Sequence, residues 1–387
     1  MKADAASGTG VGELPMEAYA AALAGLPAAG HRRLRRLLER WPAPEAWERV
    51  RTGRAGEDPT LSHLWRSAAA STTVARLWAD VQDAGVGVAV LGGAGYPSFL
   101  ADDPEPPAVL FWLGELSSLE HRRVAIVGTR RCSRYGRDMA RELGRDLALA
   151  GVSVVSGLAL GVDGASHAGA LGAGSDSGVG PPVAVVGSGL DVVYPRRHAD
   201  LWAEVGRRGA VLSESPLGTP PEPWRFPVRN RVIAALAEVV VVVESHIRGG
   251  SRYTVDAADE RGRTVMAVPG SVRSPASAYT NALLADGCPP VRDATDVLVA
   301  LGLSSATATA TATGTPAGGD PRPTPAPDAA AVLDVLGWEP ASLEQVVLRS
   351  GGSPAEITLA LVHLERDGWV ESRQGWWERV TASDRAW

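Results

Sequence analysis

The sequence predicts an α/β protein whose main domain is a doubly wound, mostly parallel β-sheet. Between residues 86 and 303, short apolar segments alternate with longer segments of helical character. Several of the apolar segments are nearly continuous in valine and alanine, which is typical of parallel strands that are covered by helices on both faces. Glycine follows many of these segments within a few residues, as expected where a strand turns into a helix.

The predicted elements of this domain follow one another along the chain. The strands are expected at residues 86–91, 109–113, 124–127, 152–156, 183–186, 210–213, 239–244 and 264–268. The helices are expected at residues 135–150, 165–171, 200–208, 228–237 and 254–261. Sheets of this type bind their ligands at the carboxyl ends of the strands, so the segments after the strands are the place to look for function.

Residues 1–85 predict a separate helical domain. Leucines recur at helical spacing, and residues 26–41 are typical of a helix, a tight turn and a second helix. The leucines are Leu23, Leu26, Leu34, Leu37 and Leu38. The sequence leaves two functions open for such a helix-hairpin-helix or SAM-like domain. Its turn amides could face DNA phosphates, or it could be a small packing domain.

The C-terminal part of the chain predicts a winged-helix domain at residues 328–387. Residues 304–327 are rich in Ala, Thr, Pro and Gly, which is typical of a flexible linker. Helices are expected at 329–336, 343–349 and 353–367, and a hairpin is expected around Gln374-Gly375. Winged-helix proteins often place the third helix in the DNA major groove. Here that helix carries Glu356, Glu365 and Asp367, which favours protein docking or regulation over binding to duplex DNA.

Composition excludes several classes of protein. The chain has 387 residues, 45% of them hydrophobic, and a formal net charge of −6, so no global charge indicates nucleic acid. Cys132 and Cys288 are the only cysteines, which excludes a disulfide framework and a cysteine-rich zinc site. The sequence contains no uncharged apolar run of membrane-spanning length, and its N-terminus has no signal-peptide pattern. We therefore expect a soluble cytoplasmic protein that does not enter a membrane.

Glycines and hydroxyl side chains gather after the predicted strands. The residues of this set are Gly128, Thr129, Ser156, Gly157, Gly187, Ser188, Gly189, Gly250 and Ser251. Because the carboxyl ends of parallel strands share one edge of a sheet, we expect a floor of backbone N–H groups and hydroxyls there. Such a floor suits anionic oxygens.

Arginines beside this floor narrow the prediction to a polyanion. Arg130 follows the strand at 124–127, and residues 121–137 contain six arginines and no acidic residue. The segment around Phe226 adds further arginines and an amide to the predicted site, namely Arg225, Arg229, Asn230 and Arg231. An aromatic ring flanked by guanidinium groups is typical of sites for single-stranded nucleic acid, because bases stack on the ring and phosphates pair with the cations.

Candidates for catalysis are few. Asp163 and His167 lie about one helical turn apart and could form a general acid–base pair, but helix capping and packing explain them better. Glu214 and Glu244 are interpreted as structural partners of arginine, and Asp191 as a residue that fixes its loop. We therefore predict no catalytic residues, no metal site and no cofactor.

Taken together, these segments resemble the DprA/Smf family of DNA-processing proteins. The resemblance rests on "VAIVGTR", "VVSGLALGVDGASHAGAL", "GSGLDVVYPRRH", "WRFPVRNRVIAALA", "GGSRYT" and "AVPGS", which occur in order between residues 90 and 290. It implies an extended Rossmann-like fold and a homodimer that is not an enzyme. It also implies a protein that binds and protects single-stranded DNA and loads the RecA recombinase during natural transformation. The residues implicated are Arg130, Ser156, Gly157, Ser188, Phe226, Arg229, Asn230 and Arg231.

The sequence departs from the family pattern at several points and leaves two alternatives open. Leu160 stands where the family usually has arginine, residues 172–182 form an insertion, and Tyr279 replaces a usual glycine.

The first alternative is an enzyme of the phosphoribohydrolase type. The segment "RGGSRYTVDAADE" keeps the glycines of that enzyme's phosphate loop, but it has no glutamate at the required spacing. The second alternative is a nucleotide sensor, which would bind mononucleotides more tightly than oligonucleotides.

Overall fold

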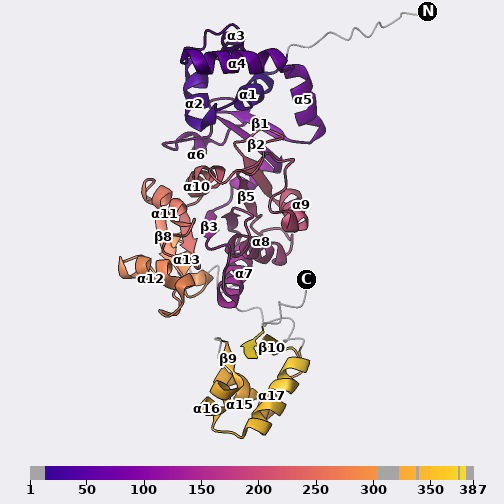
Figure 1. Cartoon of the computed structure of the whole chain (residues 1–387), viewed down its shortest axis with the longest axis vertical. Coiled ribbons are helices and arrows are strands. Elements are labelled where there is room, and N and C mark those ends of the chain that lie inside the picture. The colour runs from indigo at the N-terminus through magenta and orange to yellow at the C-terminus, as the bar shows by residue number, and fades with distance from the viewer. Residues whose placement is uncertain (1–13, 304–321, 337–339, 374, 381–387) are drawn as a thin grey trace, which may run out of the picture. The chain divides into compact units, whose positions relative to one another are not determined.

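The fold is described from a computed structural model that covers residues 14–303, 322–336, 340–373 and 375–380. Within these ranges the chain forms two compact units, a larger one that contains residues 14–132 and 139–303 and a smaller one that contains the C-terminal helices (Figure 1). Across the described ranges, no helix has the length and apolar character that crossing a bilayer requires.

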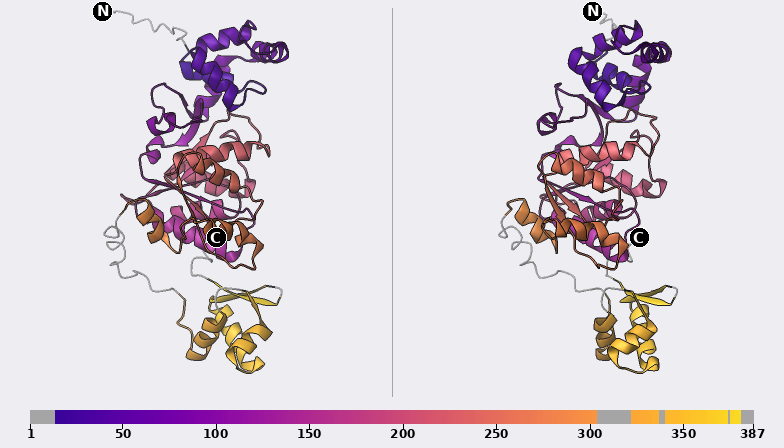
Figure 2. Two further views of the ribbon diagram at one scale, coloured as in Figure 1. Left: turned by 90° about the vertical axis from the view of Figure 1, so that its left-hand side faces the viewer. Right: turned by 60° about the vertical axis from the view of Figure 1, so that its left-hand side comes forward.

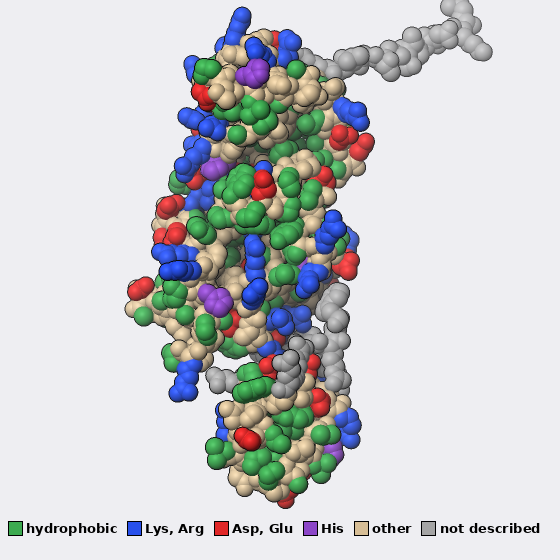
Figure 3. Space-filling view, viewed as in Figure 1, with side chains coloured by type: hydrophobic (Ala, Val, Ile, Leu, Met, Phe, Trp, Pro, Cys, Tyr) green, Lys and Arg blue, Asp and Glu red, His purple; other side chains and the backbone are tan. Residues whose placement is uncertain are grey.

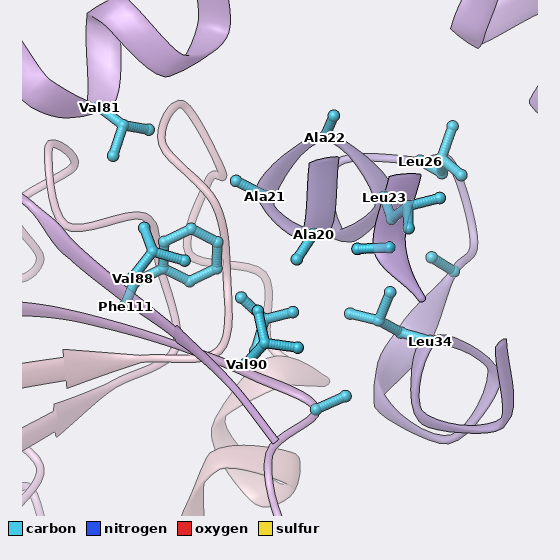
Figure 4. Close-up of a cluster of buried hydrophobic side chains, with 14 of the residues drawn as sticks. Ala20, Ala21, Ala22, Leu23, Leu26, Leu34, Val81, Val88, Val90 and Phe111 are labelled. Atoms are coloured by element: carbon cyan, nitrogen blue, oxygen red, sulfur yellow. The ribbon is translucent and has the colours of Figure 1, made fainter. Parts of the chain in front are cut away.

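The larger unit begins with a group of helices, as predicted for the N-terminal region. They are α1 (Met16–Ala24), α2 (Gly30–Arg40), α3 (Ala43–Arg51), α4 (Pro59–Ser71) and α5 (Val74–Asp83). Leu23 and Leu34 belong to the same buried cluster as Val88 and Phe111 from the first two strands (Figure 4). The helical region therefore shares its core with the edge of the sheet.

All eight predicted strands are present. They are β1 (Gly87–Val90), β2 (Val109–Gly114), β3 (Arg123–Val127), β4 (Ser153–Ser156), β5 (Val183–Val186), β6 (Ala210–Ser213), β7 (Val239–Val242) and β8 (Thr264–Ala267). They form one sheet in the order β1-β2-β6-β5-β4-β3-β7-β8. The six strands from β6 to β8 in this order pair in parallel, whereas β2 pairs antiparallel with both of its neighbours, β1 and β6. The prediction of a mostly parallel, doubly wound sheet is confirmed.

Helices cover both faces of the sheet (Figures 1 and 2). On one side lie α7 (Arg134–Leu149), α8 (Val162–Gly172) and α9 (Ala199–Arg208); on the other lie α10 (Arg225–Leu236) and α11 (Arg252–Asp259). Successive side chains of a strand point to opposite faces of the sheet, so each strand packs against the helices of both layers. Val186 belongs to the apolar cluster of Trp202 in α9, whereas Val185 belongs to that of Val232 in α10.

Several helices differ from the sequence prediction. Helices α8 and α10 begin at Val162 and Arg225, each three residues before its predicted start. The short α6 (Ser98–Ala101) and the later α12 (Ala278–Ala285) and α13 (Ala294–Ala300) were not predicted. Each of these three helices has eight residues or fewer, too few for a clear helical periodicity.

The order of the strands determines where a crevice opens. From β3 the chain proceeds outward through β4, β5 and β6, and it then returns to place β7 and β8 on the other side of β3. The segments after β3 and β7 therefore diverge to opposite faces of the sheet. Ligands of doubly wound sheets bind at such a switch point, outside the carboxyl ends of the two strands.

The smaller unit has the predicted winged-helix architecture. Its helices are α15 (Pro327–Leu336), α16 (Leu343–Ser350) and α17 (Pro354–Arg366), and its strands β9 (Ala341–Ser342), β10 (Val370–Arg373) and β11 (Trp376–Arg379) form a small sheet. A capping box begins α17, with Ser353 and Glu356 bonded to each other's backbone N–H. Residues 304–321 of the predicted linker and Gln374 of the hairpin lie outside the described residues, and the domain boundaries stay predictions.

Candidate nucleic-acid interface

A cavity of about 620 Å³ lies at the switch point of the sheet, at the carboxyl ends of β3 and β7. Its walls come from the segment after β3, the first turn of α8, the first turns of α10, the start of α11 and the segment before it. The lining residues that the sequence predicted are Gly128, Thr129, Arg130, Phe226, Arg229, Asn230, Gly250 and Ser251. The structure therefore brings the glycine-arginine turn and the Phe226 segment together.

An aromatic and cationic stack forms one wall of this cavity. The guanidinium carbon of Arg130 lies 4.6 Å from the centroid of the Phe226 ring. The ring of Tyr194 lies 5.6 Å from the same centroid, tilted by 34°. Arg130 is thus held over an aromatic ring by a cation–π contact, which positions its charge at the cavity.

The charges at the cavity are mostly positive. Arg130 and Arg131 are exposed, and neither forms an ion pair with any residue in the described part of the chain. Asp163 is the one carboxylic acid among the described residues that line the cavity, and it is buried. Burial raises the pKa of Asp163, while the nearby Arg229 and Arg130 guanidinium groups oppose that rise. The acid therefore does not block the cavity to an anion.

Arg229 lines the cavity and is hydrogen-bonded to residues at the ends of two strands. Its side chain is buried, and Nη1 donates to the carbonyl oxygens of Gly157, at 2.9 Å, and of Val185. A Cβ on Gly157 would lie 2.4 Å from the guanidinium nitrogens, so this position requires glycine. Burial lowers the pKa of Arg229 to about 10, an effect that Asp163 opposes and Arg130 reinforces. Arg229 therefore joins α10 to the ends of β4 and β5.

Hydrogen bonds fix the remaining walls. Asn230 Nδ2 donates to the carbonyl oxygen of Gly250 at 3.2 Å, which ties α10 to the segment before α11. The backbone N–H of Thr129 donates to the carbonyl oxygen of Glu244 at 2.7 Å, which ties the turn after β3 to the end of β7. Ser251 Oγ is buried and donates to Ser245 Oγ at 2.7 Å. These hydrogen bonds join the segments that line the cavity to one another.

Other predicted site residues do not line this cavity. They are Ser156, Gly157, Gly187, Ser188, Gly189, Arg225 and Arg231. Gly187 and Arg225 line a smaller cavity of about 140 Å³, between α10 and the N-terminal helices. The hydroxyls of Ser156 and Ser188 are used internally, since they donate to the carbonyl oxygens of Ile126 and Val192. At Gly157 and Gly187, the expected floor of open amides is instead packed against Arg229 and Arg225 of α10.

Arg231 points away from the main cavity because it lies two residues beyond Arg229 on α10, about 200° around the helix axis. Its side chain is 7% exposed and forms an ion pair with Glu214 at 2.5 Å, as the structural interpretation of Glu214 expected. Burial raises the pKa of Glu214, and Arg231 counters the rise.

The predicted run of six arginines does not form one basic edge. Arg122 and Arg123 lie at the amino end of β3, at the opposite end of the strand from Arg130. Arg122 pairs with Glu238 at 2.6 Å, and Arg123 donates to the carbonyl oxygens of Leu119 and Leu236. Because β3 runs from one edge of the sheet to the other, the arginines at its start and those that follow it lie at opposite ends of the strand.

The polar candidates for catalysis occupy structural positions. His167 is buried, its Nε2 lies 3.2 Å from the carbonyl oxygen of Val183, and it does not line the cavity. Burial lowers its pKa to about 4. Asp191 accepts a hydrogen bond from the N–H of Gly218 at 2.8 Å and thereby fixes its loop. Among the described residues, no group of three or more His, Cys, Asp or Glu side chains could hold a metal ion.

Some lining residues were absent from the predicted site. They are Arg131, Tyr194, His246 and Tyr253. Arg131 and Tyr194 belong to segments that the sequence had marked, whereas His246 and Tyr253 flank the predicted Gly250 and Ser251. The insertion at residues 172–182 contributes no lining residue.

The N-terminal helices present arginines that are partly neutralised. On the face drawn in Figure 3, basic and acidic side chains are interspersed over this region. On α2, Arg32 pairs with Glu105 at 2.8 Å and Arg35 with Glu39 at 2.7 Å. These pairs reduce the positive potential that phosphates would meet.

Two segments match known families. Residues 88–302 match the family described as DNA recombination-mediator protein A, and residues 315–375 match the DprA winged helix domain. Protein Smf of Escherichia coli is 35% identical over 286 residues, which cover 74% of this chain and 75% of the relative. The putative DNA processing protein DprA of Mycobacterium tuberculosis is 37% identical over 290 residues, which cover 71% of this chain and 69% of the relative.

A solved structure agrees with these matches. DNA processing protein A of Streptococcus pneumoniae superposes with a TM-score of 0.62 at 31% identity, covering 73% of this chain and 96% of that one. The first family match alone spans more than half of the chain. The chain therefore belongs to the DprA/Smf family of DNA-processing proteins.

Proposed function

We propose that this protein binds single-stranded DNA in the cavity at the ends of β3 and β7. The observation that carries the proposal is the stack of Arg130, Phe226 and Tyr194, which borders a cavity whose exposed charges are cationic. Aromatic rings beside unpaired guanidinium groups suit a strand whose bases and phosphates are both accessible.

Duplex DNA fits this arrangement less well. In a duplex the bases stack on one another, so the rings of Tyr194 and Phe226 would find no free base face. A single strand can turn its bases into the cavity while its phosphates meet Arg130 and Arg131 at the surface. The aromatic rings on the wall of this cavity therefore favour single-stranded DNA over duplex DNA as the ligand.

The proposed role is binding rather than chemistry. Asp163 is buried against arginines, and His167 lies outside the cavity, so the two do not form a pair that could act on a ligand. From the family's description as a recombination mediator, we further propose that the bound strand is protected and passed to RecA recombinase during natural transformation. A homodimer acting in the cytoplasm is part of the same proposal.

The proposal is tested by fluorescence anisotropy with an oligo-dT of about 20 nucleotides. We expect micromolar or tighter binding at low salt. Two or three neutralised phosphates should weaken it roughly 7- to 20-fold between about 50 and 200 mM salt. A duplex of the same length serves as the comparison, and unlabelled dTMP as the competitor. Absence of binding at low salt would remove the proposal, and displacement of oligo-dT by dTMP at similar concentrations would support the nucleotide sensor instead.

A further inference from the structure

Tyr253 is an exposed aromatic side chain on the wall of the cavity. It is the second residue of α11, it lines the cavity, and it is 55% exposed. Its backbone N–H donates to the carbonyl oxygen of Gly250 at 3.3 Å, which fixes the start of the helix. In the part of the chain that the structure describes, its side chain takes part in no hydrogen bond or ring contact. The ring is free to contact a ligand.

The other aromatic wall is already partly occupied. Phe226 has Arg130 over its ring and Tyr194 beside it, so the exposed aromatic surface of this group is the Tyr194 ring, which is 41% exposed. Tyr194 and Tyr253 therefore present two exposed rings to the same cavity from two different segments of the chain.

A packing role does not explain Tyr253. A tyrosine that stabilises a core buries its ring and finds a partner for its hydroxyl, and Tyr253 does neither. The frame around it is nevertheless rigid. Helix α11 packs against α10, and the hydrogen bond from Asn230 to Gly250 joins α10 to the segment that leads into α11. The ring is therefore presented at a defined position.

The volume of the cavity exceeds the needs of one ring. A cavity of roughly 150 Å³ accommodates a single six-membered ring. At about 620 Å³ this cavity is several times larger, so it has room for more than one base. The bases of a single strand that leaves its helical stack can each find a separate aromatic surface.

We infer that Tyr253 is a second base-stacking surface, and that the cavity takes two unstacked bases of one strand, one against Tyr194 and the other against Tyr253. This inference rests on the proposed binding of single-stranded DNA. It makes the smallest well-bound ligand a dinucleotide step rather than a mononucleotide.

The test compares Tyr253→Leu with Tyr253→Phe in the full chain, using oligo-dT and anisotropy at low salt. Leucine removes the aromatic face, and we expect roughly tenfold weaker binding. Phenylalanine keeps the face, and we expect a change within about twofold. A 2-aminopurine base placed in the oligonucleotide reports stacking by its quenched fluorescence, and the quenching should persist with phenylalanine and decrease with leucine.

Trp224→Leu is the matched control. Trp224 is 53% exposed, but it lines the smaller cavity and not the main one, so its loss should leave oligo-dT affinity unchanged. An equal loss of oligo-dT affinity in Trp224→Leu and Tyr253→Leu would contradict the inference, because an exposed ring outside the cavity would then contribute as much to binding as Tyr253. Wild-type affinity of Tyr253→Leu would overturn the inference and leave the proposed function intact. Failure of the wild-type protein to bind oligo-dT would remove the proposed function itself.

Discussion

Replacement of Asp103 by alanine is expected to lower the free energy of unfolding by about 3–5 kcal/mol. Asp103 forms a bidentate ion pair with Arg261, with Oδ2 2.7 Å from Nε and Oδ1 2.9 Å from Nη2. Both side chains are only 3% exposed. Removing the carboxylate leaves the buried guanidinium with only the exposed Glu260 carboxylate, 3.8 Å from Nη1, and water cannot easily replace the bidentate partner.

The position of this pair makes the effect relevant to the site. Arg261 follows α11, the helix that carries Tyr253, and Asp103 precedes β2. The ion pair therefore anchors the carboxyl end of a helix whose amino end lines the cavity. We expect the loss of stability to be accompanied by weaker binding of oligo-dT.

Urea unfolding followed by circular dichroism measures the change. The control is Arg292→Ala, which breaks an ion pair whose arginine side chain is 76% exposed, so its loss should change the free energy of unfolding far less than the loss of the buried pair. If the Asp103 and Arg292 variants lost stability equally, the buried pair would not have the structural role assigned to it.

Replacement of Arg130 by alanine is expected to weaken oligo-dT binding by about 1–3 kcal/mol, or roughly 5- to 150-fold at low salt. The substitution removes a proposed phosphate partner and also uncovers the Phe226 ring, on which the guanidinium lies at 4.6 Å. Arg130→Lys keeps the charge but loses the planar group, so its affinity should fall between those of the wild type and the alanine variant.

Arg36→Ala provides the control for charge. Arg36 is exposed on α2 and forms no ion pair with any described residue. Its removal changes the net charge as Arg130→Ala does but leaves the cavity unchanged. A larger loss of affinity in Arg36→Ala than in Arg130→Ala would favour the helix-hairpin-helix interpretation of the N-terminal domain over the cavity.

The sheet could be predicted from sequence because several of its strands are short segments nearly continuous in valine and alanine. Such segments are typical of parallel strands covered on both faces, and all eight predicted segments are found as strands. Helices α12 and α13 were missed because each is short and lies beside loops rich in proline and glycine.

The candidate site could be predicted only in part. Sequence identified the turn with Arg130 and the segment with Phe226, because arginine and aromatic residues beside glycine suggest a ligand. It could not tell which way each side chain points. Arg229 and Arg231 look equivalent in sequence, yet one supports the cavity and the other pairs with Glu214 behind it.

The glycine-rich turns were predicted to offer backbone N–H groups to an anion, but two of their glycines have a packing role instead. Gly157 is required because a guanidinium lies on it, and a Cβ on Gly128 would collide with Val162 and the carbonyl oxygen of Glu244. These glycines permit close packing between turns rather than direct contact with an anion. Tyr253 gave no signal in the sequence, since a single tyrosine near the start of a helix is equally common in a packed core.

The most direct measurement locates the bound strand by photochemical crosslinking. An oligo-dT that carries 5-iodouracil is irradiated with the full-length protein, and the modified peptides are identified by mass spectrometry. If the cavity binds single-stranded DNA, the adducts fall on Tyr194, Phe226 or Tyr253, and excess unlabelled oligo-dT removes them. Adducts confined to α2 or α17, with none on these three residues, would contradict the account.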